Sequence, residues 1–530
     1  MMKPYQGFAV TLALTVVGLL VVHVVCKLGS SLKHSRFRRR IRGLQYLISG
    51  PNIIEEQYML ARGAPFRVCT PSNNHVLITN PELVDEVIHA PLDCLSLHAV
   101  AKEMLQPKYT MQGFEWKEQR GVEGTGFVRA LRSRLTSHLP HLCSGLEMCI
   151  QDSLNRELER SACDGLSHVK IFPATKRLVA RANCLVFFGE ELSRNDEFAA
   201  AALDFPQTLI IMAELLRIIP TILRPMTSVA ASLALHRFKS GRTIMKYLEP
   251  VVRERLAQRE DAKYEGKTHS SKVDCMQWLI ETSPKTNPWS PTRMVGEIMA
   301  IWFSSVHQLA MATTFAIQDL SLHQDCVQSL RAELQQKCSH MKTTPDVLEG
   351  LPLLDSFVKE SIRYSNADAI TCRRKALQNF VLKDGTTISK DDWVCIPQQA
   401  LMQDPGRYSN PRTFDGFRFA KANTSLCLGQ RTDQVPDPGP SSFTTASIDW
   451  PIWGLGSMAC PGRFYASLVL KLTLSRIIQD WDSWMVDTTS RRTLTWRSST
   501  VPRESTIVTF RKRDLGDLQV VGSPDRGDLV

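Results

Sequence analysis

The fold is decided by the stretch Trp453-Gly454-Leu455-Gly456-Ser457-Met458-Ala459-Cys460-Pro461-Gly462-Arg463. Two spaced glycines precede its cysteine, and glycine lets a backbone take tight turns and approach a flat object closely. Pro461 suits the first position of a helix. We therefore expect Cys460 at a helix N-terminus, where free N–H groups and the helix dipole stabilise a thiolate. A thiolate held on such a loop can serve as an axial ligand of haem iron.

Two other interpretations of this loop remain open. Cys460 alone is compatible with a buried structural cysteine beside a turn, and Gly454-x-Gly456-x-x-Ala459 fits a degenerate dinucleotide-binding fingerprint. That fingerprint requires a preceding strand and a later strand that carries an acidic residue. Here Asp449-Trp450-Pro451 precedes the loop and a helix-like run follows it, which disfavours the nucleotide interpretation.

The loop resembles the cysteine-ligand loop of the cytochrome P450 family, where an aromatic residue, two spaced glycines and the cysteine occur in this order. The resemblance assigns Trp453, Gly456, Cys460 and Gly462 to haem binding, with Cys460 as the axial ligand. It implies haem b as the cofactor and a mainly α fold with small β-sheets, in which a long central helix lies over the haem. Met458 stands where the family usually has an Arg or His that reaches a haem propionate.

Composition narrows the class of protein. The chain has 530 residues and fourteen scattered cysteines, without a CxxC pair or zinc-finger spacing. Neither a disulfide framework nor a zinc site is indicated, and this usage fits a reducing compartment. Much of the net charge of +11 comes from seven basic residues between Lys27 and Arg42, before the first acidic residue, Glu55. A nucleic-acid arm is one interpretation of this run, but its position after an apolar segment favours a membrane flank and no nucleic-acid partner.

The apolar segment is a nineteen-residue run from Phe8 to Cys26. A helix of this length spans roughly 28 Å, close to the thickness of a bilayer core. A cleaved signal peptide is the alternative, although its apolar core is usually shorter. The basic residues that follow predict a cytosolic body. We predict a membrane anchor at 1–26, a basic linker at 27–54, a haem-thiolate domain at 55–512 and a disordered tail at 513–530, as in a single-pass protein of the endoplasmic reticulum.

A long helix is predicted from Ser290-Pro291, a cap residue followed by proline, to about His323. Its centre carries Ser304, Ser305, His307 and Gln308, which suggests that the helix passes an internal cavity. By resemblance this is the long helix over the haem. His307 and Gln308 align with the family's acid and threonine on the oxygen side, and they are our candidate catalytic residues. A core histidine is the alternative for His307.

Glu360 and Arg363 have a Glu-x-x-Arg spacing that also occurs elsewhere in the chain, as at Glu157/Arg160. The order of the motifs makes it informative, because Arg418 and then Cys460 follow. The resemblance implies that Glu360, Arg363 and Arg418 form a buried structural group that holds the cysteine loop. Buried charges need such partners, and Arg supplies several donors.

Three other segments carry further predictions. For Arg129 and Arg132, one interpretation is that either residue meets a haem propionate, and the other is that both are ordinary helix-surface residues. The apolar stretch 203–226 is core, or a lid that dips into a bilayer and admits lipophilic substrates. Thr493–Trp496 and Thr506–Phe510 are predicted to form a terminal hairpin.

The resemblance implies a haem-thiolate monooxygenase that uses O2 and electrons from NADPH through a membrane-bound cytochrome P450 reductase. Ser305-Val306-His307-Gln308-Leu309-Ala310 resembles fungal cytochromes P450 that act on terpenoids, so the expected substrate is a lipophilic terpenoid or meroterpenoid of secondary metabolism. The missing acid–threonine pair keeps open a haem-thiolate isomerase or dehydratase that does not use O2. Other classes also remain, namely a non-catalytic membrane-anchored haem-binding protein and a hydrolase with a cysteine nucleophile.

Overall fold

A computed structural model describes residues 34–111, 126–234, 237–265, 272–283, 289–338, 343–420 and 442–513. The predicted anchor, the first part of the basic linker and nearly all of the predicted tail lie outside these residues. Within them, α10 (Asp196–Ile218) is the one helix long and apolar enough to cross a membrane. Half of its most apolar window is buried inside the protein.

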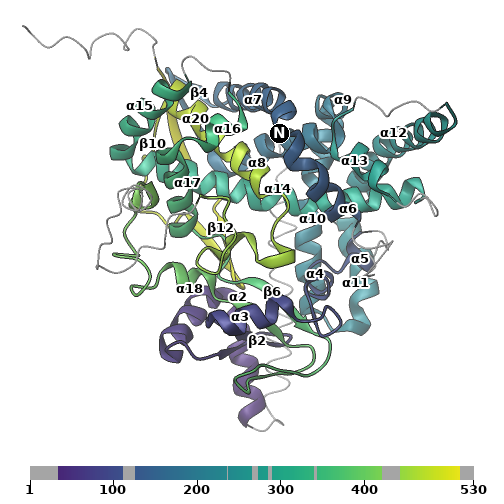
Figure 1. The fold of residues 1–530 in the computed structure, drawn as a ribbon, viewed down its shortest axis with the longest axis vertical. Helices are drawn as coiled ribbons and strands as arrows, with labels where there is room; N and C mark the ends of the chain where they lie inside the picture. The colour runs from purple at the N-terminus through teal and green to yellow at the C-terminus, as the bar shows by residue number, and fades with distance from the viewer. Residues whose placement is uncertain are drawn as a thin grey trace, which may run out of the picture.

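The long helix α14 (Pro291–Leu322) passes through the middle of the molecule (Figure 1). Its predicted start is confirmed, since Ser290 Oγ accepts a hydrogen bond from the backbone N–H of Arg293 at 3.2 Å. Buried side chains occur all round α14, as expected for a helix inside a core. The helices α7 (Thr136–Glu159), α8 (Ile171–Phe188) and α20 (Arg463–Asp480) form one bundle with it.

A five-stranded sheet lies at one end of the molecule, near α2 (His34–Ala61) and α3 (Pro81–His89) (Figure 1). The strands predicted around residues 66–69 and 75–79 are present. The segment 81–104 forms α3 and then α4 (Leu97–Leu105), so it contains two helices. The strand order is β1 (Phe66–Cys69), β2 (Asn74–Leu77), β9 (Trp393–Ile396), β6 (Thr371–Ala376) and β3 (Leu95–Ser96), with β2 and β9 parallel.

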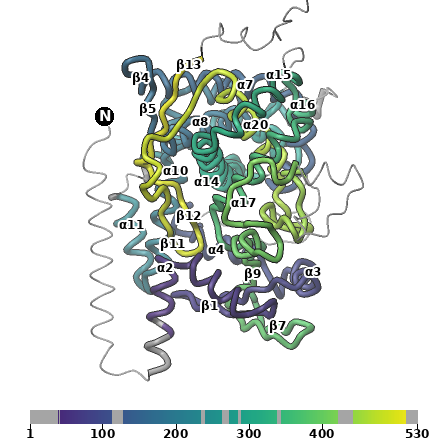
Figure 2. The backbone as a smooth tube through the Cα atoms, turned by 90° about the vertical axis from the view of Figure 1, so that its left-hand side faces the viewer, coloured from purple at the N-terminus to yellow at the C-terminus, as the bar shows by residue number. Residues whose placement is uncertain are grey.

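The predicted terminal hairpin is wrong in its pairing. The strand β11 (Thr493–Trp496) pairs with β12 (Ser499–Pro502), because the two-residue turn Arg497-Ser498 brings these nearer strands together. The turn docks on α2, where the backbone N–H of Arg497 donates to the carbonyl of Leu47 at 2.8 Å (Figure 2). The later strand β13 (Ile507–Lys512) instead pairs with β10 (Trp481–Trp484) and β5 (Leu166–Lys170), beside β4 (Ala162–Cys163).

The apolar stretch 203–226 divides at Pro220 into a buried part and an exposed part. Leu209 and Met212 of α10 are fully buried. Beyond Pro220, the short helix η2 (Thr221–Leu223) and α11 (Arg224–Ala234) expose large apolar side chains, with Ile222 86% and Met226 75% exposed. The first part therefore belongs to the core, and the second leaves an apolar surface open to solvent.

Candidate functional site

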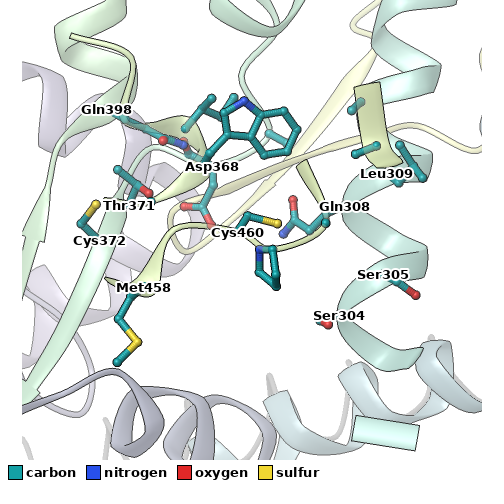
Figure 3. Close-up of a pocket in the computed structure, with 18 of the residues that line it drawn as sticks. Ser304, Ser305, Gln308, Leu309, Asp368, Thr371, Cys372, Gln398, Met458 and Cys460 are labelled. Carbon is teal, nitrogen blue, oxygen red and sulfur yellow. The ribbon is translucent and has the colours of Figure 1, made fainter. Parts of the chain in front are cut away.

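A cavity of about 480 Å³ separates α14 from the cysteine loop. Most of its wall is apolar, as shown by Val100, Leu131 and Phe187. Polar side chains on α14 face it, and Cys460 lies on the opposite wall (Figure 3). The thiol thus faces the polar centre of the long helix across an apolar space.

The cysteine loop requires its glycines. Gly454 has a φ of +73°, and a Cβ there would lie 3.1 Å from the carbonyl oxygen of Met458. Gly456 has a φ of +58°, and a Cβ there would meet the side chain of Ile88 at 2.5 Å. The backbone N–H of Cys460 donates to the carbonyl of Trp453 at 2.6 Å and closes the loop. Side chains larger than hydrogen at the two glycines are therefore strained or clash.

The prediction that Pro461 begins the following helix is wrong by two residues. Helix α20 starts at Arg463, because 461–462 form a turn with Gly462 as the cap. A backbone N–H of Gly462 and the Arg463 guanidinium lower the pKa of Cys460, but burial outweighs them and the pKa is raised. A helix N-terminus alone therefore does not hold this thiol as a thiolate. A coordinated metal ion deprotonates a thiol outright, which is compatible with a ligand role for this residue.

Glu360, Arg363 and Arg418 meet in one fully buried cluster. Arg363 donates two hydrogen bonds to Glu360, at 2.7 and 2.8 Å, and Arg418 Nε donates to the same carboxylate at 3.2 Å. The side chains of Glu360 and Arg363 are 0% exposed, and that of Arg418 is 4% exposed. Arg363 also donates to the carbonyls of Met402 and Pro411, both at 2.7 Å. The cluster therefore holds the segment 402–418 on α17 (Pro352–Tyr364).

The same helix reaches the cysteine loop through residues that the motifs did not indicate. Asp355, one turn before Glu360, accepts a hydrogen bond from the backbone N–H of Phe443 at 2.9 Å. The carbonyl of Phe443 accepts the indole N–H of Trp453 at 2.6 Å, and the carbonyl of Trp453 holds Cys460. Asp355 and Phe443 thus connect α17 to the cysteine loop. The sequence did not reveal these two residues, because they lie far apart in the chain. In addition, an Asp in the first turn of a helix is a common feature and does not by itself indicate a contact with another segment.

The two candidate oxygen-side residues are not brought together. Gln308 lines the cavity, with Ser304 and Ser305 beside it on α14 (Figure 3), but His307 is not among the lining residues. His307 makes a hydrogen bond to the backbone of Pro206 on α10, and its Nε2 atom is buried without a partner among the described residues. Since proline has no N–H, its carbonyl is the acceptor of this hydrogen bond. Burial lowers the pKa of His307 to about 4, so the ring is neutral near pH 7.

Three residues around the cysteine loop and the cavity bear on the predicted contact with a haem propionate. Met458 lines the cavity and brings no charge. Arg132 is exposed on the π-helical turn η1 (Leu131–Leu135), and it donates to the carbonyl of Ser457 next to Met458. Arg374 on β6 lines the cavity, is 3% exposed and makes no ion pair within the described part of the chain. Burial lowers the pKa of Arg374, as expected for a cation that has lost water without gaining an acid.

A cysteine on a glycine loop, facing a long helix across an apolar cavity, defines the class of haem-thiolate proteins. The model of the cytochrome P450 family matches residues 54–510. This chain belongs to the cytochrome P450 family, whose members are monooxygenases that carry haem with a cysteine thiolate as an axial ligand. They use O2, a small-molecule substrate and electrons from a redox partner.

Relatives and solved structures agree with this assignment. The chain is 27% identical to cytochrome P450 monooxygenase 103 of Postia placenta, over 89% of this chain and 91% of that protein. It is 26% identical to cytochrome P450 monooxygenase olcJ of Penicillium canescens, over 95% and 92% of the two chains. Ent-kaurene oxidase of Gibberella intermedia is also 26% identical, over 89% and 86%. The fold is similar to that of retinoic acid bound cyanobacterial CYP120A1, with a TM-score of 0.66, 18% identity and coverage of 89% and 96%.

The residues around the cavity fit a haem. A thiol faces an apolar space, and the glycines of its loop allow close approach of a flat ring. The buried cation of Arg374 has no acid partner among the described residues, which is the environment that a propionate would satisfy. A second cysteine, Cys372, also lines the cavity, but it lies on strand β6 and not on the glycine loop. Burial raises the pKa of its thiol to about 11.

Proposed function

We propose that this chain is a monooxygenase that oxidises a lipophilic polycyclic terpenoid or meroterpenoid in fungal secondary metabolism. The observation that carries the proposal is the thiol of Cys460, which faces polar side chains of α14 across an apolar cavity. An apolar wall favours a lipophilic substrate. One relative is named for the oxidation of ent-kaurene, which supports the terpenoid class. The proposed electron donor is an NADPH-dependent cytochrome P450 reductase.

The proposed location is the endoplasmic reticulum membrane, with the run Phe8–Cys26 as a single-pass anchor and the catalytic domain in the cytosol. The exposed apolar side chains of η2 and α11, such as Ile222 and Met226, support contact with a lipid surface. A lipophilic substrate dissolved in that membrane would then reach the enzyme without crossing water.

Each site residue has a proposed task. The haem, when bound, supplies the activation of O2. Cys460 holds the iron as a thiolate, Gly462 leaves room for the ring beside Trp453, and Gly456 lets the loop pack closely against Ile88. Glu360, Arg363 and Arg418 keep the surrounding segments in place. Gln308 offers an amide N–H and carbonyl to the oxygen side of the cavity, where it can hold water.

Co-expression with a fungal cytochrome P450 reductase tests this function. We expect polycyclic terpenoids supplied to the membranes to gain oxygen when NADPH is present. Product formation without reductase and NADPH would instead favour the isomerase or dehydratase. Haem uptake with no oxidised or rearranged product from a broad terpenoid panel would favour the non-catalytic haem-binding protein.

We predict that Arg374→Met weakens haem retention by about 10-fold, the lower range for loss of an outer-shell partner in a metal site. The physical reason is the loss of a buried cation that a propionate would meet. The rate of haem transfer to apomyoglobin measures retention, with circular dichroism to verify folding. Arg156→Met is the matched control, because Arg156 is exposed on α7 and is not among the cavity-lining residues. Equal transfer rates for the two variants would remove Arg374 from haem binding.

We also predict that Gln308→Leu lowers the product formed per NADPH several-fold, since it removes the polar group that faces the cavity. His307→Leu is expected to act on stability instead, by about 1 kcal/mol, through the lost hydrogen bond to Pro206. Product and NADPH assays, with urea unfolding, separate these two effects. If His307→Leu uncouples as strongly as Gln308→Leu, the oxygen-side role that the motif assigns to His307 would be supported.

A further inference from the structure

Three side chains from three helices, two of them buried and the third half-buried, form a continuous hydrogen-bonded chain. Tyr465 on α20 donates its hydroxyl proton to Asn183 Oδ1 at 2.7 Å, and Asn183 Nδ2 on α8 donates to Ser305 Oγ on α14 at 3.1 Å. The hydroxyl of Ser305 in turn donates to the carbonyl of Trp302 at 2.9 Å. Tyr465 is 4% exposed and Asn183 is 0% exposed. We call Tyr465, Asn183 and Ser305 the relay.

The relay crosses an apolar part of the core. Cys184 and Phe187 next to Asn183 on α8, and Leu468 near Tyr465 on α20, are all buried in the same apolar cluster. A polar group costs free energy in such surroundings unless it is hydrogen-bonded. Both polar atoms of the Asn183 amide have partners, so one arrangement of the three helices satisfies the relay and displaced arrangements do not.

Both ends of the relay reach the proposed site. Tyr465 lies five residues after Cys460, in the first turn of α20, and both Tyr465 and Ser305 contribute to the cavity wall. The side chain of Ser305 points away from Cys460, whereas that of Gln308, three residues later, lies toward it (Figure 3). Residues three apart are neighbours on a helix surface, so the hydrogen bond at Ser305 lies directly beside the polar group at Gln308 on α14.

The rotation of α14 about its axis decides which of its side chains meet the cavity. Successive residues of an α-helix are separated by about 100° around the axis. A modest rotation would therefore turn Ser304 and Gln308 away from Cys460. Many other contacts of α14 are apolar and non-directional, and they limit this rotation less than a directed hydrogen bond does. Other directed hydrogen bonds of α14, such as that from Trp302 Nε1 to the carbonyl of Ala202 at 2.8 Å, hold it to α10, whereas the relay ties it to α20, the helix that follows Cys460.

We propose that the relay sets the rotation of α14 relative to the cysteine loop, so that Ser304 and Gln308 face Cys460. Tyr465, Asn183 and Ser305 are then positioning residues for the oxidation. The proposal rests on the proposed haem ligation by Cys460. Through the relay, α20, the helix that follows Cys460, fixes the orientation of the polar groups of α14 on the opposite side of the cavity.

The carbon-monoxide complex of the reduced full-length enzyme provides the test, because the C–O stretching frequency responds to dipoles and hydrogen-bond donors near the bound molecule. We expect Tyr465→Phe and Ser305→Ala to shift this frequency in the same direction. Both variants should also raise several-fold the hydrogen peroxide released per NADPH. Ser305→Thr, which keeps a hydroxyl, should retain the wild-type values. The double variant should shift no further than the larger single shift, because the two residues act through one chain.

Ser321→Ala is the matched control. Its hydroxyl lies on α14 and makes a buried hydrogen bond to Ser483 Oγ at 3.1 Å, but Ser321 is not among the cavity-lining residues. A frequency that is unchanged in both relay variants, additive shifts in the double variant, or an equal shift in Ser321→Ala would each overturn the positioning role. Absence of a thiolate-type carbon-monoxide band in the wild-type enzyme would instead overturn the ligation by Cys460, and the relay proposal with it.

Discussion

Cys460→Ser is expected to abolish the carbon-monoxide difference band of thiolate ligation in the reduced enzyme. Turnover should fall by more than the roughly 100-fold that loss of an outer-shell partner costs in metal sites, because the residue removed is the ligand itself. A serine hydroxyl does not supply the electron density that a thiolate gives to iron. The difference spectrum between the reduced enzyme with and without carbon monoxide and the rate of oxygenated product measure the two effects.

Cys372→Ser is the control for this experiment. Cys372 lines the same cavity and differs by the same sulfur-to-oxygen change, but it lies on β6 beside the Leu455 backbone. We expect its variant to keep the thiolate band and most of the activity. A band lost in Cys372→Ser and retained in Cys460→Ser would reverse the assignment. Retention in both variants would remove cysteine ligation in this cavity.

Arg363→Ala is expected to lower the free energy of unfolding by about 3–5 kcal/mol, as breaking a buried ion pair does. The change removes two donors from Glu360 and leaves the carbonyls of Met402 and Pro411 without the hydrogen bonds that Arg363 gives them. Because typical proteins are stable by only about 5–15 kcal/mol, little folded haem protein should accumulate. Urea unfolding and the yield of haem-loaded enzyme measure the effect.

The chain offers a control with the same spacing. Arg160 pairs with Glu157 at 3.3 Å as another Glu-x-x-Arg, but the Arg160 side chain is 61% exposed. Arg160→Ala should therefore change the free energy of unfolding by no more than about 1 kcal/mol. Similar losses in the two variants would mean that burial does not decide the importance of the pair, contrary to our interpretation. Arg363→Lys should fall between them, since an ammonium group cannot make the bidentate contact.

The local signals in the sequence predicted the elements that depend on neighbours in the chain. The Ser290-Pro291 start of α14 is a cap within one turn, and the glycines around Cys460 act through their own backbone angles. The partner of β11 was predicted wrongly because two later strands, β12 and β13, could each pair with it. The nearer strand, β12, is the actual partner, since a two-residue turn connects it to β11. Propensity identifies a strand but does not choose its partner.

The sequence by itself determined the family, through Glu360, Arg363, Arg418 and Cys460 in this order, since these residue types and spacings are visible without coordinates. Only the tertiary structure decided how the site is oriented. It turned Gln308 to the cavity and His307 to Pro206, although the two are neighbours in the chain. The physical reason is that the rotation of a helix within a core is set by contacts with other helices, and these contacts come from residues far away in the sequence.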